Sequence, residues 1–250
     1  EVYGDGAPLF LVRGLGGDGT GWLFFQVPVF SKKYKVVIFD NRGVGRTDKP
    51  EGPYSIKMFA DDTVGLMNRL GIEKAHVWGQ SMGGAIAQRI AIHYPERVRS
   101  LILEGTWSKT SEYGKYILEI WGILAERGRE ALAKGYLPFL FKYQFFNEKP
   151  EVIRRTEIRI KETIQPTHAF ISQNLACLEH DTSSELSKIT CPALILLGEQ
   201  DIIFPVDEAK LMVQNIPNSE LVVLKGVGHL AHMEAPDQTN KVVLDFLEKH

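Results

Sequence analysis

Short apolar runs alternate with amphipathic segments along most of this chain. Six runs, each bounded by turn residues, have the length and composition of buried strands: residues 8–12, 34–39, 75–78, 98–103, 193–197 and 220–224. Four of these runs are followed by apolar residues at helical spacing, in residues 55–70, 85–94, 206–215 and 236–249. Strands that alternate with helices in this way predict an α/β protein with a mostly parallel, doubly wound sheet and helices on both faces.

Residues 107–184 break this alternation. The segment has no convincing β run, is rich in aromatic and mixed-charge residues, and has helical spacing in residues 116–127 and 150–163. Because it lies between two core strands, it predicts an inserted helical cap, with residues 1–106 and 185–250 forming the α/β core. Most of its aromatic side chains are expected in the interior of the cap, and some should shape an apolar substrate pocket.

One short motif joins a predicted strand to a predicted helix. It reads Gly79-Gln80-Ser81-Met82-Gly83, a Gly-x-Ser-x-Gly pattern in the strand–turn–helix context that hydrolases use for a nucleophilic serine. The two glycines leave room where a Cβ would clash in so tight a turn. The turn would present the Ser81 hydroxyl at a helix N-terminus, whose free amides can stabilise an oxyanion. The alternative is an ordinary Gly/Ser turn.

A serine nucleophile needs a base, and the base needs an orienting carboxylate. His229 lies in a glycine-rich loop after the last predicted strand, and its imidazole can exchange a proton near neutral pH. Asp201 follows the preceding core strand and is the predicted acid, with Glu104 in reserve. Both loops follow strand ends, as Ser81 does, so one edge of the sheet should gather all three side chains. The remaining internal histidines are interpreted as structural: His76, His93, His168, His180 and His232.

Two further loops follow predicted strands. Residues 13–19 are rich in glycine but lack both Gly-x-Gly-x-x-Gly in register and Gly-Lys-Ser/Thr, which argues against nucleotide binding. We expect this loop to complete the oxyanion hole; a plain glycine loop is the alternative. Asp40 and Arg42 lie in the other loop, and we expect them to hold it by hydrogen bonds and an ion pair rather than to act in catalysis.

The net charge and the lengths of the apolar runs indicate which partners the protein is not built to bind. A net charge near −2 gives no indication of a nucleic-acid partner, and no run of 18 apolar residues suggests a membrane span.

Cys177 and Cys191 have neither a disulfide framework nor metal-ligand spacing, so we expect reduced thiols and no metal, consistent with a cytoplasmic location. No signal peptide is recognisable; the chain opens at Glu1 in what reads as a strand end, and we expect a preceding segment. A homodimer is compatible with these features.

Several of these segments together resemble a known family. Residues 40–47, the Gly52-Pro53-Tyr54 step and residues 79–84 are similar to the 3-oxoadipate enol-lactonase and small-carboxylesterase branch of the α/β-hydrolase superfamily. The resemblance covers nearly the whole chain. It implies an α/β-hydrolase fold with an inserted cap and no cofactor.

The same resemblance implies the roles of particular residues. It implies a Ser81/Asp201/His229 triad, in the Ser…Asp…His chain order of α/β-hydrolases. It also implies oxyanion donors at the backbone amides of Leu15 and Met82.

One residue departs from the family pattern. Arg13 precedes Gly14 where the family usually has His-Gly. The oxyanion hole can survive this change because its donor would be the amide of Leu15. We expect Arg13 to pair with a neighbouring acid; the alternative is that it attracts a carboxylate-bearing substrate.

The function that these residues favour is hydrolysis of a small-molecule ester or lactone through acyl-Ser81. We expect Trp107 and Leu230 to contact the substrate. Two alternatives stay open: carbon–carbon bond hydrolysis of ring-cleavage diketones, which uses the same triad, and a ligand receptor that has kept the fold. Dehalogenase and epoxide hydrolase activities are disfavoured, since those relatives have Asp at the position of Ser81.

Overall fold

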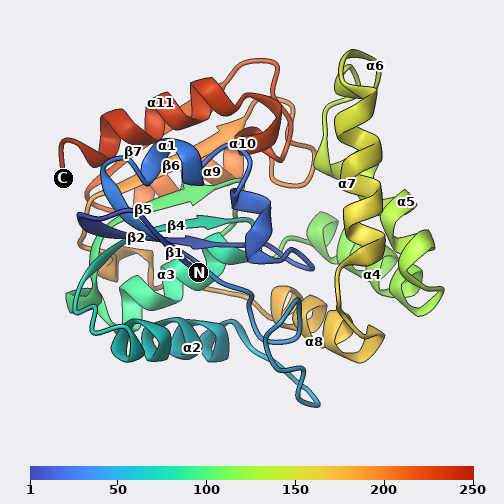
Figure 1. The fold of residues 1–250 in the computed structure, drawn as a ribbon, viewed down its shortest axis with the longest axis horizontal. Coiled ribbons are helices and arrows are strands. Elements are labelled where there is room, and N and C mark those ends of the chain that lie inside the picture. Colours follow the sequence, from blue (N-terminus) through green and yellow to red (C-terminus); the bar gives the residue numbers. More distant parts are fainter.

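The computed structural model describes residues 1–250, and a single seven-stranded sheet forms its centre (Figure 1). The strands lie in the order β1-β3-β2-β4-β5-β6-β7, with only β1 antiparallel to its neighbour. Their bounds are β1 (Val2–Tyr3), β2 (Ala7–Val12), β3 (Tyr34–Ile38), β4 (Ala75–Gln80), β5 (Val98–Glu104), β6 (Ala193–Gly198) and β7 (Ser219–Leu224). The predicted mostly parallel, doubly wound sheet is therefore confirmed.

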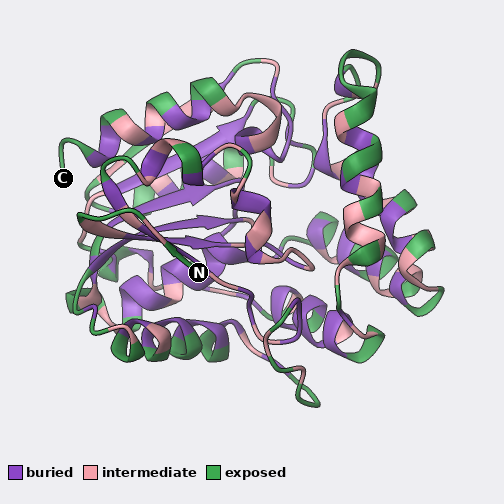
Figure 2. Cartoon of the chain, in the orientation of Figure 1, coloured by how far each residue is buried: buried purple, intermediate pink, exposed green.

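Helices cover both faces of this sheet. The core helices are α1 (Val27–Phe30), α2 (Ile56–Arg69), α3 (Met82–His93), α9 (Val206–Asn215), α10 (Ala231–Glu234) and α11 (Pro236–Leu247). Apolar side chains of α2, α3 and α9 share one hydrophobic cluster, and those of α1 and α11 share another on the opposite face. Figure 2 shows the strands buried between these layers, while α2 and α11 turn exposed sides to solvent. No helix of the protein is both long enough and apolar enough to cross a membrane.

The two-residue period of the strands explains this division. In β6, Leu194 and Leu196 belong to the cluster under α1 and α11, while Ile195 packs on the other side with α9. Successive side chains in a strand point to opposite faces, so a strand covered on both faces must be apolar throughout. This is why the core strands are recognisable as continuous apolar runs.

Five more helices lie between β5 and β6 in the chain, and we call them the helical insertion. They are α4 (Glu112–Glu126), α5 (Arg129–Leu140), α6 (Phe145–Glu148), α7 (Pro150–Glu162) and α8 (Thr167–Leu178). The insertion stands beyond the carboxyl ends of the parallel strands (Figure 1). The sequence periodicity predicts α4 and α7 but not the other three. In α8 most side chains are buried, so no polar stripe reveals the helical period.

The strand order changes direction at β2, and a ligand site can form where it does so. From β2 the chain continues to β3 on one side, and β4 then pairs with the other side of β2. Loops after β2 and β4 therefore diverge at the carboxyl edge of the sheet, where ligands bind in open α/β folds. These loops contain residues 13–17 and Ser81.

The loop after β3 is held by separate contacts from its two charged residues. Asp40 is buried and accepts hydrogen bonds from the backbone amides of Gly19 and Arg46, each at 2.8 Å. Arg42 pairs with Asp62 on α2 instead of with Asp40. The expected hydrogen bonds and ion pair both exist. Asp40 fastens this loop to residues 13–19, which we call the glycine-rich loop from here on.

Candidate active site

Ser81 occupies a strained turn between β4 and α3. Its φ of 56° and ψ of −121° are rarely adopted by a residue with a side chain. A Cβ on Gly79 would come within 2.1 Å of the carbonyl oxygen of Gly83, and a Cβ on Gly83 within 2.1 Å of that of Val12. Neither position tolerates a side chain, so the glycines of the motif make the sharp turn sterically feasible.

Two backbone amides near Ser81 have no hydrogen-bond acceptor within the protein. Met82 is the first residue of α3, so no carbonyl precedes it within the helix. The amide of Leu15 donates to no acceptor in the protein. A Cβ on Gly14 would lie 2.9 Å from the Cβ of Ser81, so the glycine-rich loop passes very close to the serine.

The helical insertion holds the glycine-rich loop in place. Tyr136 of α5 donates a hydrogen bond from its hydroxyl to the carbonyl oxygen of Leu15, at 3.2 Å. Gln173 of α8 accepts one from the amide of Gly16, at 3.1 Å. These contacts pair the Leu15 carbonyl and the Gly16 amide, and the Leu15 amide between them stays unpaired. The sequence carries no local signal for either side chain, because each acts across more than 120 residues.

His229 and Asp201 form a buried pair. His229 Nδ1 lies 2.8 Å from Asp201 Oδ2, while Asp201 Oδ1 accepts the backbone amides of Ile203 and Phe204 at 2.9 and 3.1 Å. The carboxylate is thus held on both oxygens. The pair places the imidazole proton on Nδ1 and leaves Nε2 as an acceptor.

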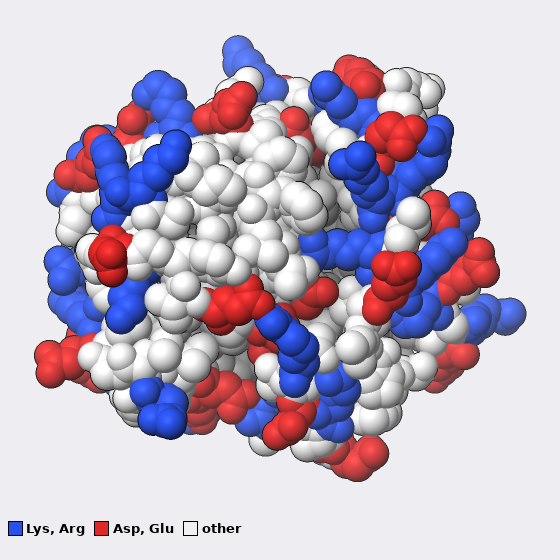
Figure 3. All heavy atoms as spheres, in the orientation of Figure 1, with Lys and Arg blue, Asp and Glu red and all other residues white.

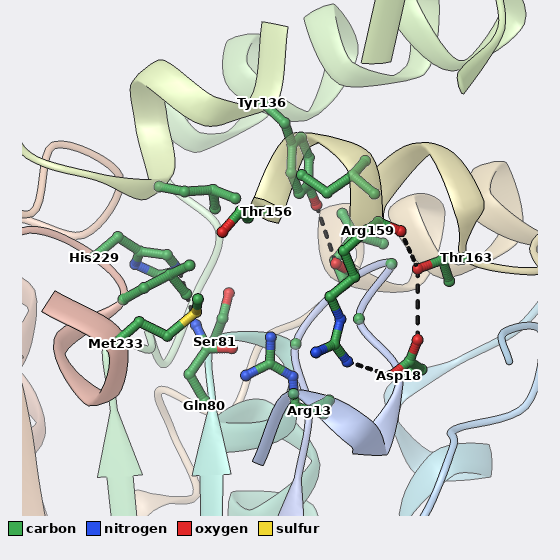
Figure 4. Close-up of a pocket in the computed structure, with 18 of the residues that line it drawn as sticks. Arg13, Asp18, Gln80, Ser81, Tyr136, Thr156, Arg159, Thr163, His229 and Met233 are labelled. Atoms are coloured by element: carbon green, nitrogen blue, oxygen red, sulfur yellow. Dashed lines mark hydrogen bonds and ion pairs between the residues drawn. The ribbon is translucent and has the colours of Figure 1, made fainter. Parts of the chain in front are cut away.

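The accepting nitrogen of His229 faces Gln80 in this structure. Gln80 Nε2 lies 3.1 Å from His229 Nε2, and the Ser81 hydroxyl makes no hydrogen bond. Ser81 and His229 nevertheless line the same cavity, with Gln80 between them on its floor (Figure 4). Gln80 stands inside the serine motif, but nothing in the sequence indicates that its amide would contact the base.

Glu104 has a different partner from His229. It lies at the end of β5, and its Oε1 is 2.8 Å from Nδ1 of His232, both side chains being fully buried. Trp78 Nε1 donates to its other oxygen at 2.9 Å. Burial alone would raise the pKa of Glu104, but the charge interaction and hydrogen bonds with His232, together with Trp78, lower it.

Arg13 makes no ion pair, so the expected pairing with a neighbouring acid is wrong. Its Nη1 lies 2.7 Å from His232 Nε2, and the guanidinium stacks 5.2 Å from the centre of the Trp22 ring. Glu104 is separated from it by the imidazole of His232, and Asp18 is bound to Arg159. Burial, and then the neighbouring Arg159, lowers the pKa of Arg13 to about 10, which leaves the guanidinium protonated at neutral pH.

The remaining histidines lie away from Ser81, in line with their structural interpretation. His76 is buried in β4 with Nδ1 2.7 Å from Ser100 Oγ, and burial lowers its pKa to about 4. Burial lowers the pKa of His180 to about 3. His93 ends α3 and His168 lies in the first turn of α8, both outside the lining of the cavity.

Ser81 lies in the lining of two neighbouring cavities. The first, of about 690 Å³ out to its open mouth, is lined by Arg13, Asp18, Arg159, His229, Leu230 and Met233, among others, and we call it the polar arm. The second, of about 430 Å³ out to its mouth, has eight hydrophobic residues among its fourteen, including Trp107, Leu118 and Phe204, with Lys109 and Glu208 as its charged ones, and we call it the apolar arm. Ser81 and Leu15 border both arms, so a molecule bound across the serine would extend into each.

One residue in the wall of the apolar arm also packs near His229. The rings of Trp107 and Phe204 stack 4.5 Å apart, and Phe204 lies 5.6 Å from the His229 ring. Trp107, one of the two expected substrate contacts, therefore lies on the apolar arm. The other, Leu230, lies on the polar arm.

This chain is similar to one family model and to several known proteins. The family model described as "alpha/beta hydrolase fold" matches residues 7–236. A protein of Azorhizobium caulinodans named "Putative carbamate hydrolase RutD" is 28% identical over 98% of this chain and 93% of its own. The 3-oxoadipate enol-lactonase 2 of Acinetobacter baylyi is 29% identical over 96% of this chain and 88% of its own. The malate-bound structure of a thermophilic esterase from Thermogutta terrifontis is 31% identical, with a TM-score of 0.91, over 100% of this chain and 92% of its own.

Proposed function

This chain belongs to the alpha/beta hydrolase fold family, and on that premise we propose that it is a serine hydrolase that cleaves a carboxylic ester or lactone. The proposal depends mainly on the 2.8 Å hydrogen bond between His229 and Asp201, beside a cavity that Ser81 also lines. In this proposal Ser81 is the nucleophile, His229 the base, and Asp201 the acid that orients it.

Acylation begins when Ser81 Oγ attacks the carbonyl carbon of the substrate. His229 Nε2 takes the hydroxyl proton, so Ser81 Oγ must first replace Gln80 Nε2 at that nitrogen. The negative charge moves to the carbonyl oxygen, which the amides of Leu15 and Met82 stabilise. The bond from the carbonyl carbon to the leaving oxygen then breaks, and His229 gives its proton to that oxygen.

Deacylation repeats these steps with water. A water molecule gives a proton to His229 Nε2 and attacks the acyl carbon, again forming an oxyanion between the two amides. The bond to Ser81 Oγ breaks, the serine regains the proton from His229, and the carboxylic acid leaves. No electron donor or acceptor is required.

The helical insertion would act as the cap of this site. Its helices supply Trp121 and Tyr136 above the serine, and they hold the loop that carries Leu15. We assign the core to residues 1–106 and 185–250 and the cap to residues 107–184. In this assignment the acyl and leaving groups are selected by the two arms beneath the cap, with contacts from Trp107 and Leu230.

The names of the relatives support hydrolysis of an acyl group. A carbamate hydrolase, an enol-lactonase and an esterase all transfer an acyl carbon to water, which matches a serine nucleophile beside an oxyanion hole. They differ in the group attached to that carbon. The choice among ester, lactone and carbamate must therefore come from measured rates.

The test is loss of hydrolysis and labelling in Ser81→Ala. The purified protein should hydrolyse an aryl ester or a lactone and react with a fluorophosphonate probe, and Ser81→Ala should lose both. Ser184→Ala, which removes an exposed serine, is the matched control and should retain both. Full activity in Ser81→Ala would reject the proposal.

A panel of substrates distinguishes the other activities. Rates on an aryl ester, a lactone, an aryl carbamate and a vinylogous ring-cleavage diketone should be compared on one enzyme preparation. A higher kcat/KM on the diketone than on any ester would favour carbon–carbon bond hydrolysis. Labelling at Ser81 with a single turnover and no further hydrolysis would favour a receptor.

A further inference from the structure

The polar arm contains a cation that the proposed chemistry does not use. We propose that Arg13 makes this enzyme selective for esters whose leaving group carries a carboxylate. This inference rests on the proposed serine hydrolysis and deepens it, since it names which half of the substrate is anionic.

Arg13 is held rigidly at the floor of the polar arm. Its Nη1 is bonded to His232 Nε2 at 2.7 Å, and His232 is fixed in turn by Glu104, which lies 2.8 Å from Nδ1. Because His232 Nδ1–H donates to Glu104, its Nε2 is free to accept from the guanidinium. The position of Arg13 is thus set before any ligand arrives, which reduces the entropy cost of binding.

The guanidinium keeps donors for a ligand. It has five N–H groups, of which the protein uses one, and its Nε is buried without any partner. In Figure 4 the Arg13 side chain lies between Ser81 and Arg159, both of which line the same cavity. A carboxylate in this space would satisfy donors that the protein leaves open, in the geometry that arginine prefers.

The formal charges of the residues that line the polar arm sum to one positive charge, from Arg13 and Arg159 against Asp18. Arg159 is bound to Asp18, so these two charges offset each other. Arg13 has no carboxylate in contact, and Glu104 lies behind the His232 ring. Figure 3 shows basic side chains reaching into the hollow between the sheet and the helical insertion. An anionic group entering the polar arm would therefore be favoured over a neutral group of the same shape.

The position of the base indicates which half of the substrate enters this arm. His229 lines the polar arm and is not part of the lining of the apolar arm. Since His229 must give its proton to the leaving oxygen, the leaving group belongs on the same side as the imidazole. The acyl group then extends into the apolar arm, between Trp107 and Leu118. The carboxylate that Arg13 recognises is accordingly on the leaving group.

The experiment compares kcat/KM for two matched pairs of esters. In the first pair, butanoate is esterified to 4-hydroxybenzoate or to neutral 4-hydroxybenzamide, so only the leaving group changes charge. In the second, the phenyl monoester of hexanedioic acid is compared with its terminal amide, so only the acyl group changes charge. Each rate is divided by the rate of the same ester in hydroxide. We expect the ratio of anionic to neutral kcat/KM to exceed ten in the first pair and to lie below one in the second.

Variants separate charge recognition from loop structure. In Arg13→Gln the first ratio should fall at least tenfold, whatever change the neutral ester shows, and Arg13→Lys should retain part of it. Asp18→Asn keeps the hydrogen bond of Arg13 to His232 and removes the carboxylate that offsets Arg159, so the ratio should rise severalfold even if Arg13→Gln does not fold. Arg155→Gln removes an exposed arginine from the same helix as Arg159 and should leave the ratio unchanged.

A first ratio near one, or equal ratios in wild type and Arg13→Gln, would overturn the inference. If the neutral esters are hydrolysed in a Ser81-dependent manner while the ratio stays near one, only the inference about Arg13 fails. If no ester is hydrolysed, or if Ser81→Ala is fully active, the proposed function itself fails.

Discussion

Glu104 and His232 form a second buried carboxylate–imidazole pair, with Oε1 and Nδ1 2.8 Å apart, beside the pair of Asp201 and His229. The two histidines are three residues apart; Glu104 ends β5, and Asp201 follows the neighbouring strand β6. The two pairs differ in the partner of the imidazole nitrogen that does not face the acid. That of His229 faces the floor of the cavity beside Gln80, while that of His232 accepts from Arg13. In the proposed mechanism the pair of His229 transfers protons, while the pair of His232 holds Arg13 of the glycine-rich loop.

The first prediction separates these two acids. Asp201→Asn should lower kcat on a neutral aryl ester roughly a thousandfold or more, because an amide no longer fixes the Nδ1–H tautomer of His229. Glu104→Gln should lower kcat less and should reduce the free energy of unfolding by about 1–3 kcal/mol, since it weakens the buried hydrogen bonds to His232 and Trp78. Steady-state kinetics and urea unfolding of both variants provide the measurements. The reverse pattern, with activity lost only in Glu104→Gln, would make Glu104 the catalytic acid.

The second prediction concerns the closeness of the glycine-rich loop to the serine. Gly14→Ala should lower kcat by more than tenfold, because its Cβ would meet the Ser81 Cβ at 2.9 Å and the Gln80 Oε1 at 2.8 Å and would push the Leu15 amide away. Gly65→Ala is the matched control: it lies on an exposed position of α2 with nothing within 4 Å of a new Cβ. That variant should keep its kcat and gain about 0.5–1 kcal/mol of stability. Equal kcat in the two variants would count against an oxyanion role for this loop.

The core of the fold could be predicted from the sequence because its signals are local. A strand covered on both faces must be apolar at every position, as in β6, and a short amphipathic helix such as α2 shows its period directly. The helical insertion was predicted less well. The side chains of α8 are buried on most sides, and α5 contains Pro138 near its end, so neither helix shows a clear polar face.

Some features of the candidate site could likewise be predicted from the sequence, and others could not. Ser81 is recognisable because its strained turn needs glycines within two residues on either side, and the structure gives the steric reason for each. The partner of Arg13 could not be read from the sequence. It depends on His232, 219 residues away, having taken Glu104 as its own partner. Gln80 is similar: its position is fixed by the motif, but its contact with His229 depends on how the last loop folds back.

The last prediction is a loss of stability in mild acid to which the buried residues His76 and His180 contribute. Burial lowers the pKa of His76 to about 4 and that of His180 to about 3, below the value of about 6.5 expected in the unfolded chain. Between pH 6.5 and about 4 the unfolded chain therefore binds protons that the folded protein does not, so the free energy of unfolding falls as pH falls. Each histidine contributes at most about 1.4 kcal/mol per pH unit in this window. His76→Gln should flatten the slope measured by urea unfolding at pH 7, 6 and 5, while His93→Gln, at an exposed position, should leave it unchanged. Identical slopes in wild type and His76→Gln would show that His76 does not bring about the acid sensitivity.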